Sequence, residues 1–321
     1  MAPLRAFRRA KPTKLFFATD LHGSRVCFRK FCEALDFYGC DELILGGDVT
    51  GKLLVPIAVH NGQATFDLGG ETRTVDASDL PEHRRRIENM GYYPVVAEPD
   101  EIEALEDGEA YERRLLEEAV RRIGEWVEYA EERLGDGGTT IWFAPGNDDE
   151  PVIDAAFEGS RVFQNCEGRV VTVGGHEMIA TGWANPTPWN TPRECSEAEL
   201  EVRLRAQVDA LSDPGTAIFN FHVPPHGTTL DVCPELDDEL RVVTVMGNPV
   251  QAHAGSTAVR SVIEEYQPVA SLHGHIHESR NAARLGRTFA INPGSEYAEG
   301  ILLGAIVSVT DDGASYSFTA G

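Results

Sequence analysis

The chain has 321 residues, is 42% hydrophobic, and carries 52 acidic against 28 basic residues, which gives a formal net charge of −24. This length supplies the core of one large domain, and no apolar run approaches the ~20 residues of a membrane span. Strong negative charge repels phosphate backbones and therefore disfavours extensive nucleic-acid binding.

The composition also bears on the compartment. Residues 1–14 are basic but lack the apolar stretch of a secretion signal, so we expect a flexible tail and a cytoplasmic protein. Six cysteines without a Cys-x-x-Cys pair indicate free thiols. Only four of the basic residues are lysines. This acidic, lysine-poor composition suits a salt-rich cytoplasm and predicts a halophilic source; the alternative is an ordinary acidic protein from a GC-rich genome.

The first elements form a strand–helix–strand unit. Residues 14–20, KLFFATD, predict a buried strand that runs into a turn, and residues 25–39 have apolar side chains at helical spacing. Residues 41–48 predict a second strand. Such a unit favours parallel pairing of its two strands.

Residues 53–138 have a different pattern. Residues 55–76 alternate in polarity around Asn-Gly and Gly-Gly turns, which predicts a small β-meander. Residues 80–91 and 109–135 predict helices, and the longer one has one apolar and one charged face. We expect this segment to be an insertion that forms a lid.

Strand-like runs then resume at 139–148, 169–183, 216–225, 269–277 and 287–295, and the chain closes with a predicted hairpin. Five strands of the chain end in side chains that bind metals. They are Asp20 with His22, Asp48, Asn147, His222, and His275 with His277. Each alone is an ordinary turn residue or cap. Because sites form beyond the carboxyl ends of strands in α/β sheets, five such endings in order indicate one shared site.

The ordered set D-x-H, G-D, G-N-acid, H and G-H-x-H resembles the calcineurin-like metallophosphoesterase superfamily over residues 15–295. The segments ILGGDVTGK, HGHIHESR and INPGSEYAEGIL are similar to an uncharacterised prokaryotic branch related to the cyclic-nucleotide phosphodiesterases. The resemblance implies an α/β domain over residues 15–321. Its fold would be a calcineurin-like four-layer αββα sandwich of two mixed β-sheets flanked by helices, with the β-meander and helices of 53–138 inserted.

The resemblance also implies two divalent metal ions that share Asp48. Asp20, His22, Asp48 and His277 would hold the first ion. Asp48, Asn147, His222 and His275 would hold the second. Mixed oxygen and nitrogen ligands suit manganese, with iron or zinc as alternatives. Two such ions can activate a water and neutralise a phosphoryl group during in-line displacement.

One position departs from the superfamily pattern. Many members have a histidine after the asparagine, where it binds phosphate and protonates the leaving group, but this chain has Asp148. A carboxyl beside two cations stays ionised and is a poor acid near neutral pH. His226 and His253 are candidate replacements, or else plain loop histidines. His253 precedes a predicted helix whose N-terminus, near Ser256, is expected to hold a phosphate.

The predicted function is therefore a metal-dependent phosphoesterase that hydrolyses a small phosphomonoester or phosphodiester through a metal-bound hydroxide. Asp48 and the metals would present the hydroxide, and Asn147 with Asp148 would position the phosphate. One alternative is a nuclease of the same superfamily, against which the negative charge counts. The other is a non-catalytic scaffold protein, against which the complete ligand set counts. The sequence leaves the substrate, the native metal and the oligomeric state open.

Overall fold

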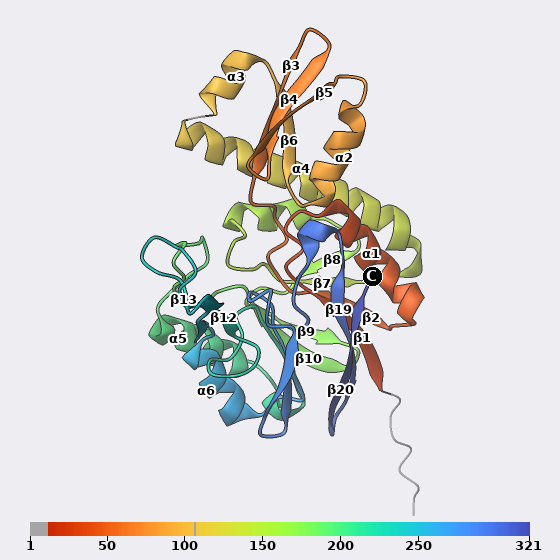
Figure 1. Cartoon of the computed structure of the whole chain (residues 1–321). Helices are drawn as coiled ribbons and strands as arrows, with labels where there is room; N and C mark the ends of the chain where they lie inside the picture. The colour runs from red at the N-terminus through yellow and green to blue at the C-terminus, as the bar shows by residue number, and fades with distance from the viewer. Residues whose placement is uncertain (1–11, 106) are drawn as a thin grey trace, which may run out of the picture.

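The computed structural model describes residues 12–105 and 107–321, and its centre is a pair of six-stranded mixed sheets (Figure 1). The first sheet has the strand order β20-β19-β1-β2-β7-β8. Its strands are β1 (Thr13–Ala18), β2 (Glu42–Leu45), β7 (Ile141–Phe143), β8 (Phe163–Asn165), β19 (Leu303–Thr310) and β20 (Gly313–Ala320). The adjacent strands β1, β2, β7 and β8 run parallel, so their carboxyl ends share one edge of the sheet.

The second sheet has the order β17-β18-β16-β11-β10-β9. Its strands are β9 (Val170–Val173), β10 (His176–Thr181), β11 (Ile218–Phe221), β16 (Ala270–Leu272), β17 (Asn281–Leu285) and β18 (Thr288–Asn292). Strands β10, β11, β16 and β18 are parallel, and β9 and β17 are antiparallel edge strands.

Alternation along the strands builds the layers. Successive side chains of a strand point to opposite faces of its sheet. In β1, Phe17 packs between the two sheets with Ile218 and Leu272, whereas Phe16 packs outward under a helix. Both phenylalanines are fully buried. The strands are therefore apolar on both faces because both faces are covered.

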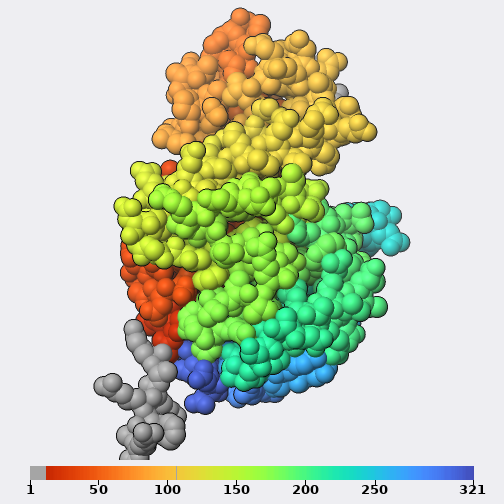
Figure 2. Space-filling model, turned by 180° about the vertical axis from the view of Figure 1, so that it is seen from behind, coloured from red at the N-terminus to blue at the C-terminus, as the bar shows by residue number. Residues whose placement is uncertain are grey.

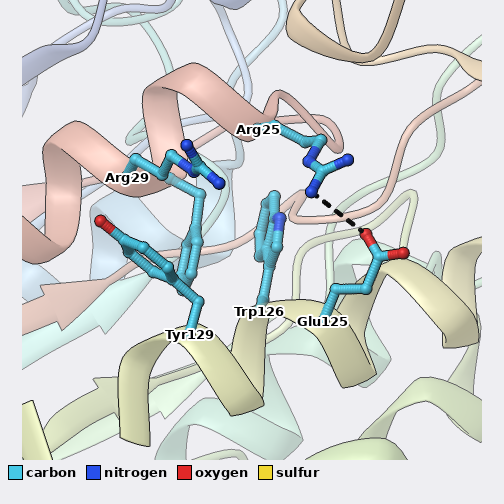
Figure 3. Close-up of a pocket in the computed structure, with 6 residues that line it drawn as sticks. Arg25, Arg29, Glu125, Trp126 and Tyr129 are labelled. Atoms are coloured by element: carbon cyan, nitrogen blue, oxygen red, sulfur yellow. Dashed lines mark ion pairs between the residues drawn. The ribbon is translucent and has the colours of Figure 1, made fainter. Parts of the chain in front are cut away.

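Helices cover the two outer faces. Helices α1 (Arg25–Tyr38) and α4 (Gly108–Leu134) lie on the first sheet, and α5 (Glu197–Val208) and α6 (Thr257–Tyr266) lie on the second. The predicted four-layer αββα sandwich is thus confirmed. Figure 3 shows the contact of α1 with α4, where Arg25 faces Glu125 at 3.9 Å and Arg29 lies over Tyr129. The cavity among these side chains is about 30 Å³, which holds a water rather than a substrate.

The insertion forms a separate four-stranded sheet with the order β5-β4-β3-β6. Its elements are β3 (Leu54–His60), β4 (Gln63–Leu68), β5 (Glu71–Asp76), α2 (Leu80–Asn89), β6 (Tyr93–Ala97) and α3 (Pro99–Ala104). The predicted meander and the helix α2 are present, and β6 adds a parallel strand beside β3. Figure 2 shows these orange and yellow residues projecting from the body of the molecule.

Helix α4 belongs to both parts. Near its middle, Ala119 packs with Leu54 and Tyr93 in a core of the insertion. Leu116 and the residues from Ile123 onward pack on the first sheet, and Trp126 stacks on Phe28 with 4.1 Å between ring centroids. The predicted insertion of residues 53–138 therefore includes part of the main sandwich.

Short elements complete the chain. Two-stranded ribbons pair β12 (Val232–Pro234) with β15 (Gln251–His253), and β13 (Thr244–Val245) with β14 (Asn248–Pro249). The 3-10 helices are η1 (Gly135–Gly137), η2 (Pro151–Phe157), η3 (Pro214–Thr216) and η4 (Tyr297–Glu299). Residues 1–11 of the predicted tail lie outside the described part, and β1 already begins at Thr13. All six cysteines are free thiols, as predicted. No described helix is long and apolar enough to cross a membrane.

Candidate metal centre

The side chains that follow the parallel strands of both sheets meet at one place. Asp20 and His22 follow β1, and Asp48 follows β2. His222 Nε2 lies 3.3 Å from Asp48 Oδ2 and 3.8 Å from Asp20 Oδ1. His277 Nε2 lies 3.4 Å from Asp20 Oδ1 and 3.1 Å from His22 Nε2. The two sheets therefore contribute to a single cluster.

Asn147 and His275 extend the cluster. His275 Nδ1 lies 2.7 Å from Asn147 Oδ1. The Asn147 amide nitrogen donates to Thr191 Oγ1 at 2.9 Å and to Asp148 Oδ1 at 3.0 Å, so the amide oxygen is the atom presented to His275. All seven side chains that the sequence assigned as metal ligands thus lie together in the structure.

The backbone at this site is unusual. The φ angles of Asp20, His22, Asp48 and His275 are 55°, 41°, 49° and 68°, in the left-handed region that L-residues rarely adopt. The glycine before Asn147 also has no space for a side chain. A Cβ on Gly146 would lie 2.1 Å from Asp48 Oδ1. The tight turns therefore bring the ligand side chains closer together than ordinary strand ends allow.

Two histidine nitrogens have fixed roles. His22 Nδ1 lies 3.2 Å from the Thr50 carbonyl oxygen, which only accepts hydrogen bonds, so Nδ1 carries the proton and the Nε2 lone pair points toward the cluster, 3.1 Å from His277 Nε2. His273 is also fully buried, but its Nδ1 donates to the Phe221 carbonyl at 2.8 Å. This agrees with a structural rather than a ligand role for His273.

The electrostatics of the cluster are strongly perturbed. Burial alone would raise the pKa of Asp20. The hydrogen bond with His277 and the charge of His222 outweigh burial and bring the pKa down to about 2. Burial likewise opposes ionisation of Asp48, and the charge of His222 holds its pKa well below the ordinary value. Burial disfavours the charged His222 ring, but Asp48 raises its pKa to about 9. Without a cation, the two carboxylates therefore keep a proton on His222.

The donor set fits divalent cations. In the buried His222 ring, Nε2 faces Asp48 Oδ2 at 3.3 Å, whereas Nδ1 lacks a hydrogen-bond partner among the described residues, which is costly for a buried polar group. Three groups of ligand atoms lie within 4.8 Å of one another: Asp20 with His22 and His277, Asp20 with Asp48 and His222, and His22 with Asp48 and Asp148. Carboxylate oxygens and imidazole nitrogens at such spacing are typical ligands of manganese, iron and zinc.

Asp149 is a buried residue of this site that the sequence pattern did not indicate. Its fully buried carboxylate accepts hydrogen bonds from the backbone N–H groups of Val49 at 3.1 Å, Thr50 at 2.9 Å and Gly146 at 2.9 Å. The Thr50 hydroxyl donates to it at 2.6 Å. Asp149 therefore ties the loop of Asp48 to the loop of Asn147. The second acid in the sequence Asn-Asp-Asp was the available signal.

Lys52 is the second residue that sequence reasoning passed over. Its ammonium forms an ion pair with Asp148 Oδ2. Burial raises the pKa of Asp148, the charge of Asp48 raises it further, and Lys52 opposes both, which leaves it at about 7 in the metal-free protein. The backbone N–H of Asp148 also donates to Asp48 Oδ1 at 2.9 Å. Asp148 thus connects Lys52 to the cluster.

His226, in the loop that follows His222, lies beside His253. Their ring centroids are 5.7 Å apart. The buried carboxylate of Asp231 accepts from His253 Nδ1 at 2.9 Å and lies 3.6 Å from His226 Nδ1. The Ser256 N–H donates to the Pro224 carbonyl at 2.9 Å, which joins the two loops. Both rings are about half exposed, at 42% for His226 and 47% for His253.

The phosphate expected at the N-terminus of α6 is a wrong prediction. The carboxylate of Glu197 accepts from the N–H groups of Thr257 at 3.0 Å and Ala258 at 2.9 Å. The Ser256 hydroxyl donates to the same carboxylate at 2.7 Å. Glu197 therefore already occupies the position that an anion would take.

Comparison with known proteins supports the fold. No family model matches the chain. An uncharacterised protein of Methanocaldococcus jannaschii is 27% identical over 179 residues, which are 55% of this chain and 69% of that protein. The structure of TT1561 of Thermus thermophilus covers 95% of this chain and 98% of its own, at 12% identity and a TM-score of 0.53. An archaeal phosphodiesterase covers 96% of this chain and 100% of its own, at 11% identity and a TM-score of 0.36. The chain shares its fold, two mixed six-stranded sheets flanked by helices, with the TT1561 structure.

Proposed function

We propose that the protein is a metal-dependent hydrolase of small phosphoesters. The observation that carries the proposal is the convergence of six further oxygen and nitrogen ligands from the two sheets around Asp48, with His222 Nδ1 buried and without a hydrogen-bond partner among the described residues. Manganese is the first metal to test, with iron or zinc next, because the cluster contains no thiolate among the described residues. Two divalent ions held there would activate a water and neutralise charge on the phosphoryl group.

The first ion would be held by Asp20, His22, Asp48 and His277. The second would be held by Asp48, Asn147, His222 and His275. Hydrogen bonds fix several of these ligands before any metal binds. The His275 N–H donates to the Asp20 carboxylate at 3.1 Å and 3.2 Å. The Asp148 N–H binds Asp48 Oδ1, which leaves Oδ2 toward the histidines. Such partners orient ligands and raise metal affinity.

The leaving group needs a proton from another source if Asp148 stays ionised beside the cations. Asp231 holds His253 Nδ1 through a hydrogen bond, so the other nitrogen of the half-exposed ring is available to solvent or ligand. His226 lies beside it. We therefore keep His253 and His226 as the candidate proton donors.

Metal analysis and a substrate screen test the proposal. The purified protein should contain about two divalent ions per chain, and it should hydrolyse some of the phosphomonoesters, linear diesters and cyclic nucleotides offered with Mn²⁺. Asp48→Asn should lose metal and turnover together, because Asp48 is shared by both proposed sites. Asp311→Asn, in an exposed turn, is the matched control and should change neither. An Asp48→Asn protein that keeps its metal and full turnover would refute the proposal.

A further inference from the structure

Lys52 occupies an uncommon place for a lysine in this chain. It is one of only four lysines among 28 basic residues, and it follows Asp48 by four positions. Its ammonium pairs with Asp148, whose side chain is only 16% exposed. A carboxylate oxygen of Asp148 lies within 4.8 Å of ligand atoms of His22 and Asp48. One side chain therefore separates the ammonium from the metal cluster.

The ion pair lies against the cluster. The Asp148 N–H donates to Asp48 Oδ1 at 2.9 Å, and the Asp148 carboxylate pairs with the Lys52 ammonium. The residue that holds Lys52 is therefore itself hydrogen-bonded to a proposed metal ligand.

The insertion holds the backbone on both sides of Lys52. The Gly51 N–H donates to Tyr93 Oη at 2.8 Å, and the Tyr93 N–H donates to the Leu53 carbonyl at 2.9 Å. A Cβ on Gly51 would lie 2.1 Å from the Gly91 carbonyl oxygen. Lys52 therefore starts from a fixed backbone position, while its side chain remains 45% exposed and open to a ligand.

We propose that Lys52 binds the phosphoryl group of the substrate, and that Asp148 is the positioning residue that holds the ammonium at the edge of the metal cluster. This inference rests on the proposed phosphoesterase function. The ammonium donates hydrogen bonds to a non-bridging phosphate oxygen, a contact that suits a compact cation with three donors. Lys52 keeps its proton throughout. The bond from phosphorus to the leaving oxygen breaks as the bond from phosphorus to the water oxygen forms; the attacking water gives up a proton to solvent, and the leaving oxygen takes one from a candidate donor, His253 or His226.

The pair accounts for the departure at position 148. A histidine after Asn147 would supply one partly positive group to the phosphate. Here Asp148 supplies a negative group instead, and Lys52 restores a positive one from a different loop. Lys52 lies where the loop that carries Asp48 joins the insertion. The insertion therefore contributes to substrate binding, because Tyr93 fixes the backbone at Gly51.

Three variants and a phosphate-binding measurement test this inference. Lys52→Ala, Lys52→Gln and Lys52→Arg are compared with Lys14→Ala, which removes an exposed lysine at the start of β1. Each protein is loaded with Mn²⁺, its metal content is measured, and the binding of inorganic phosphate is followed by calorimetry. We expect unchanged metal content and about 10-fold weaker phosphate binding or more for Lys52→Ala and Lys52→Gln, because hydrogen bonds to charged groups are the strong ones. Lys52→Arg should recover part of the affinity.

Turnover supplies the second readout. With a phosphoester that the wild type hydrolyses, kcat/KM should fall about 10²-fold in Lys52→Ala, as for loss of one donor to the transition state. Phosphate affinity and kcat/KM both within about 3-fold of wild type, relative to Lys14→Ala, would overturn the inference, since a lost charged hydrogen bond exceeds that factor. Loss of metal from Lys52→Gln would also overturn it, since the lysine would then act on the metal centre. If the wild type hydrolyses no ester, the proposed function fails, and the phosphate measurement still decides the role of Lys52.

Discussion

Replacing Asp149 with alanine should destabilise the metal-free protein by about 3 kcal/mol, a magnitude set by the hydrogen-bond donors it leaves unpaired. The buried carboxylate accepts from three backbone N–H groups, those of Val49, Thr50 and Gly146. Each buried donor left without a partner costs about 1–3 kcal/mol. Three unpaired donors therefore lower the free energy of unfolding by roughly 3–9 kcal/mol. We expect the lower end of this range, because water can hydrogen-bond to the exposed donors and because the variant no longer buries a carboxylate charge beside Asp48.

Equilibrium urea unfolding in EDTA and molar salt measures this loss without the contribution of bound metal. Asp148→Ala is the matched control because it removes the same group one residue away. Burial and the charge of Asp48 raise the pKa of Asp148, which shows that its ionised form is disfavoured in the metal-free fold. That variant should lose less than about 1 kcal/mol. The reasoning is refuted if Asp149→Ala loses less than about 1 kcal/mol, the cost of a single unpaired donor, or if the two variants lose the same amount.

The remaining predictions concern pH, salt and the leaving group. Burial opposes the charged His222 ring, but Asp48 raises its pKa to about 9. The ring therefore stabilises the metal-free fold fully below its ordinary value of 6.5, and this contribution is lost as the pH rises through about 9. Urea midpoints in EDTA should fall across this range, and a constant midpoint would contradict the assignment. Because the net charge is −24, the melting temperature should rise from low salt to about 1 M NaCl, where the Debye length is ~3 Å; a flat or falling curve would argue against halophilic adaptation. Aryl phosphate esters should react far faster than alkyl esters, because the general acid that Asp148 does not supply is worth roughly 10²–10⁴-fold. Asp148→Ala should lower kcat/KM by the same factor for aryl and alkyl esters, because it removes the partner that holds Lys52 but no proton donor. His253→Ala or His226→Ala should slow alkyl esters selectively if that ring donates the proton. Equal wild-type rates for both ester types, with a loss in Asp148→Ala that is larger for alkyl than for aryl esters, would identify Asp148 as the acid.

The positions around Asp48 could be predicted because each follows a strand, and parallel strands bring their carboxyl ends to one edge. That rule needs only local patterns and chain order. The same patterns predicted the meander of the insertion and the helices α2 and α4.

Residues that act across long sequence separations could not be found in this way. Asp149 binds Thr50, which is 99 positions earlier in the chain. Glu197 binds the start of α6 from 60 positions away, where the sequence shows only an open helix N-terminus. Lys52 had no recognisable partner until Asp148 was placed beside it. In each case the chemistry depends on which loops the fold brings together, and composition and periodicity carry no record of that pairing.

The shared helix α4 limits how the insertion can be exchanged between proteins. Its 27 residues span about 40 Å as one continuous helix. Tyr111, Leu115 and Ala119 pack in the projecting subdomain, whereas Leu116 and the stretch from Ile123 to Leu134 pack on the first sheet. A deletion of residues 53–138 would strip that sheet of a covering layer as well as removing the projection. Because the two sets of contacts interleave along one helix, an exchange of the insertion between proteins must keep α4 whole rather than cut it in a loop.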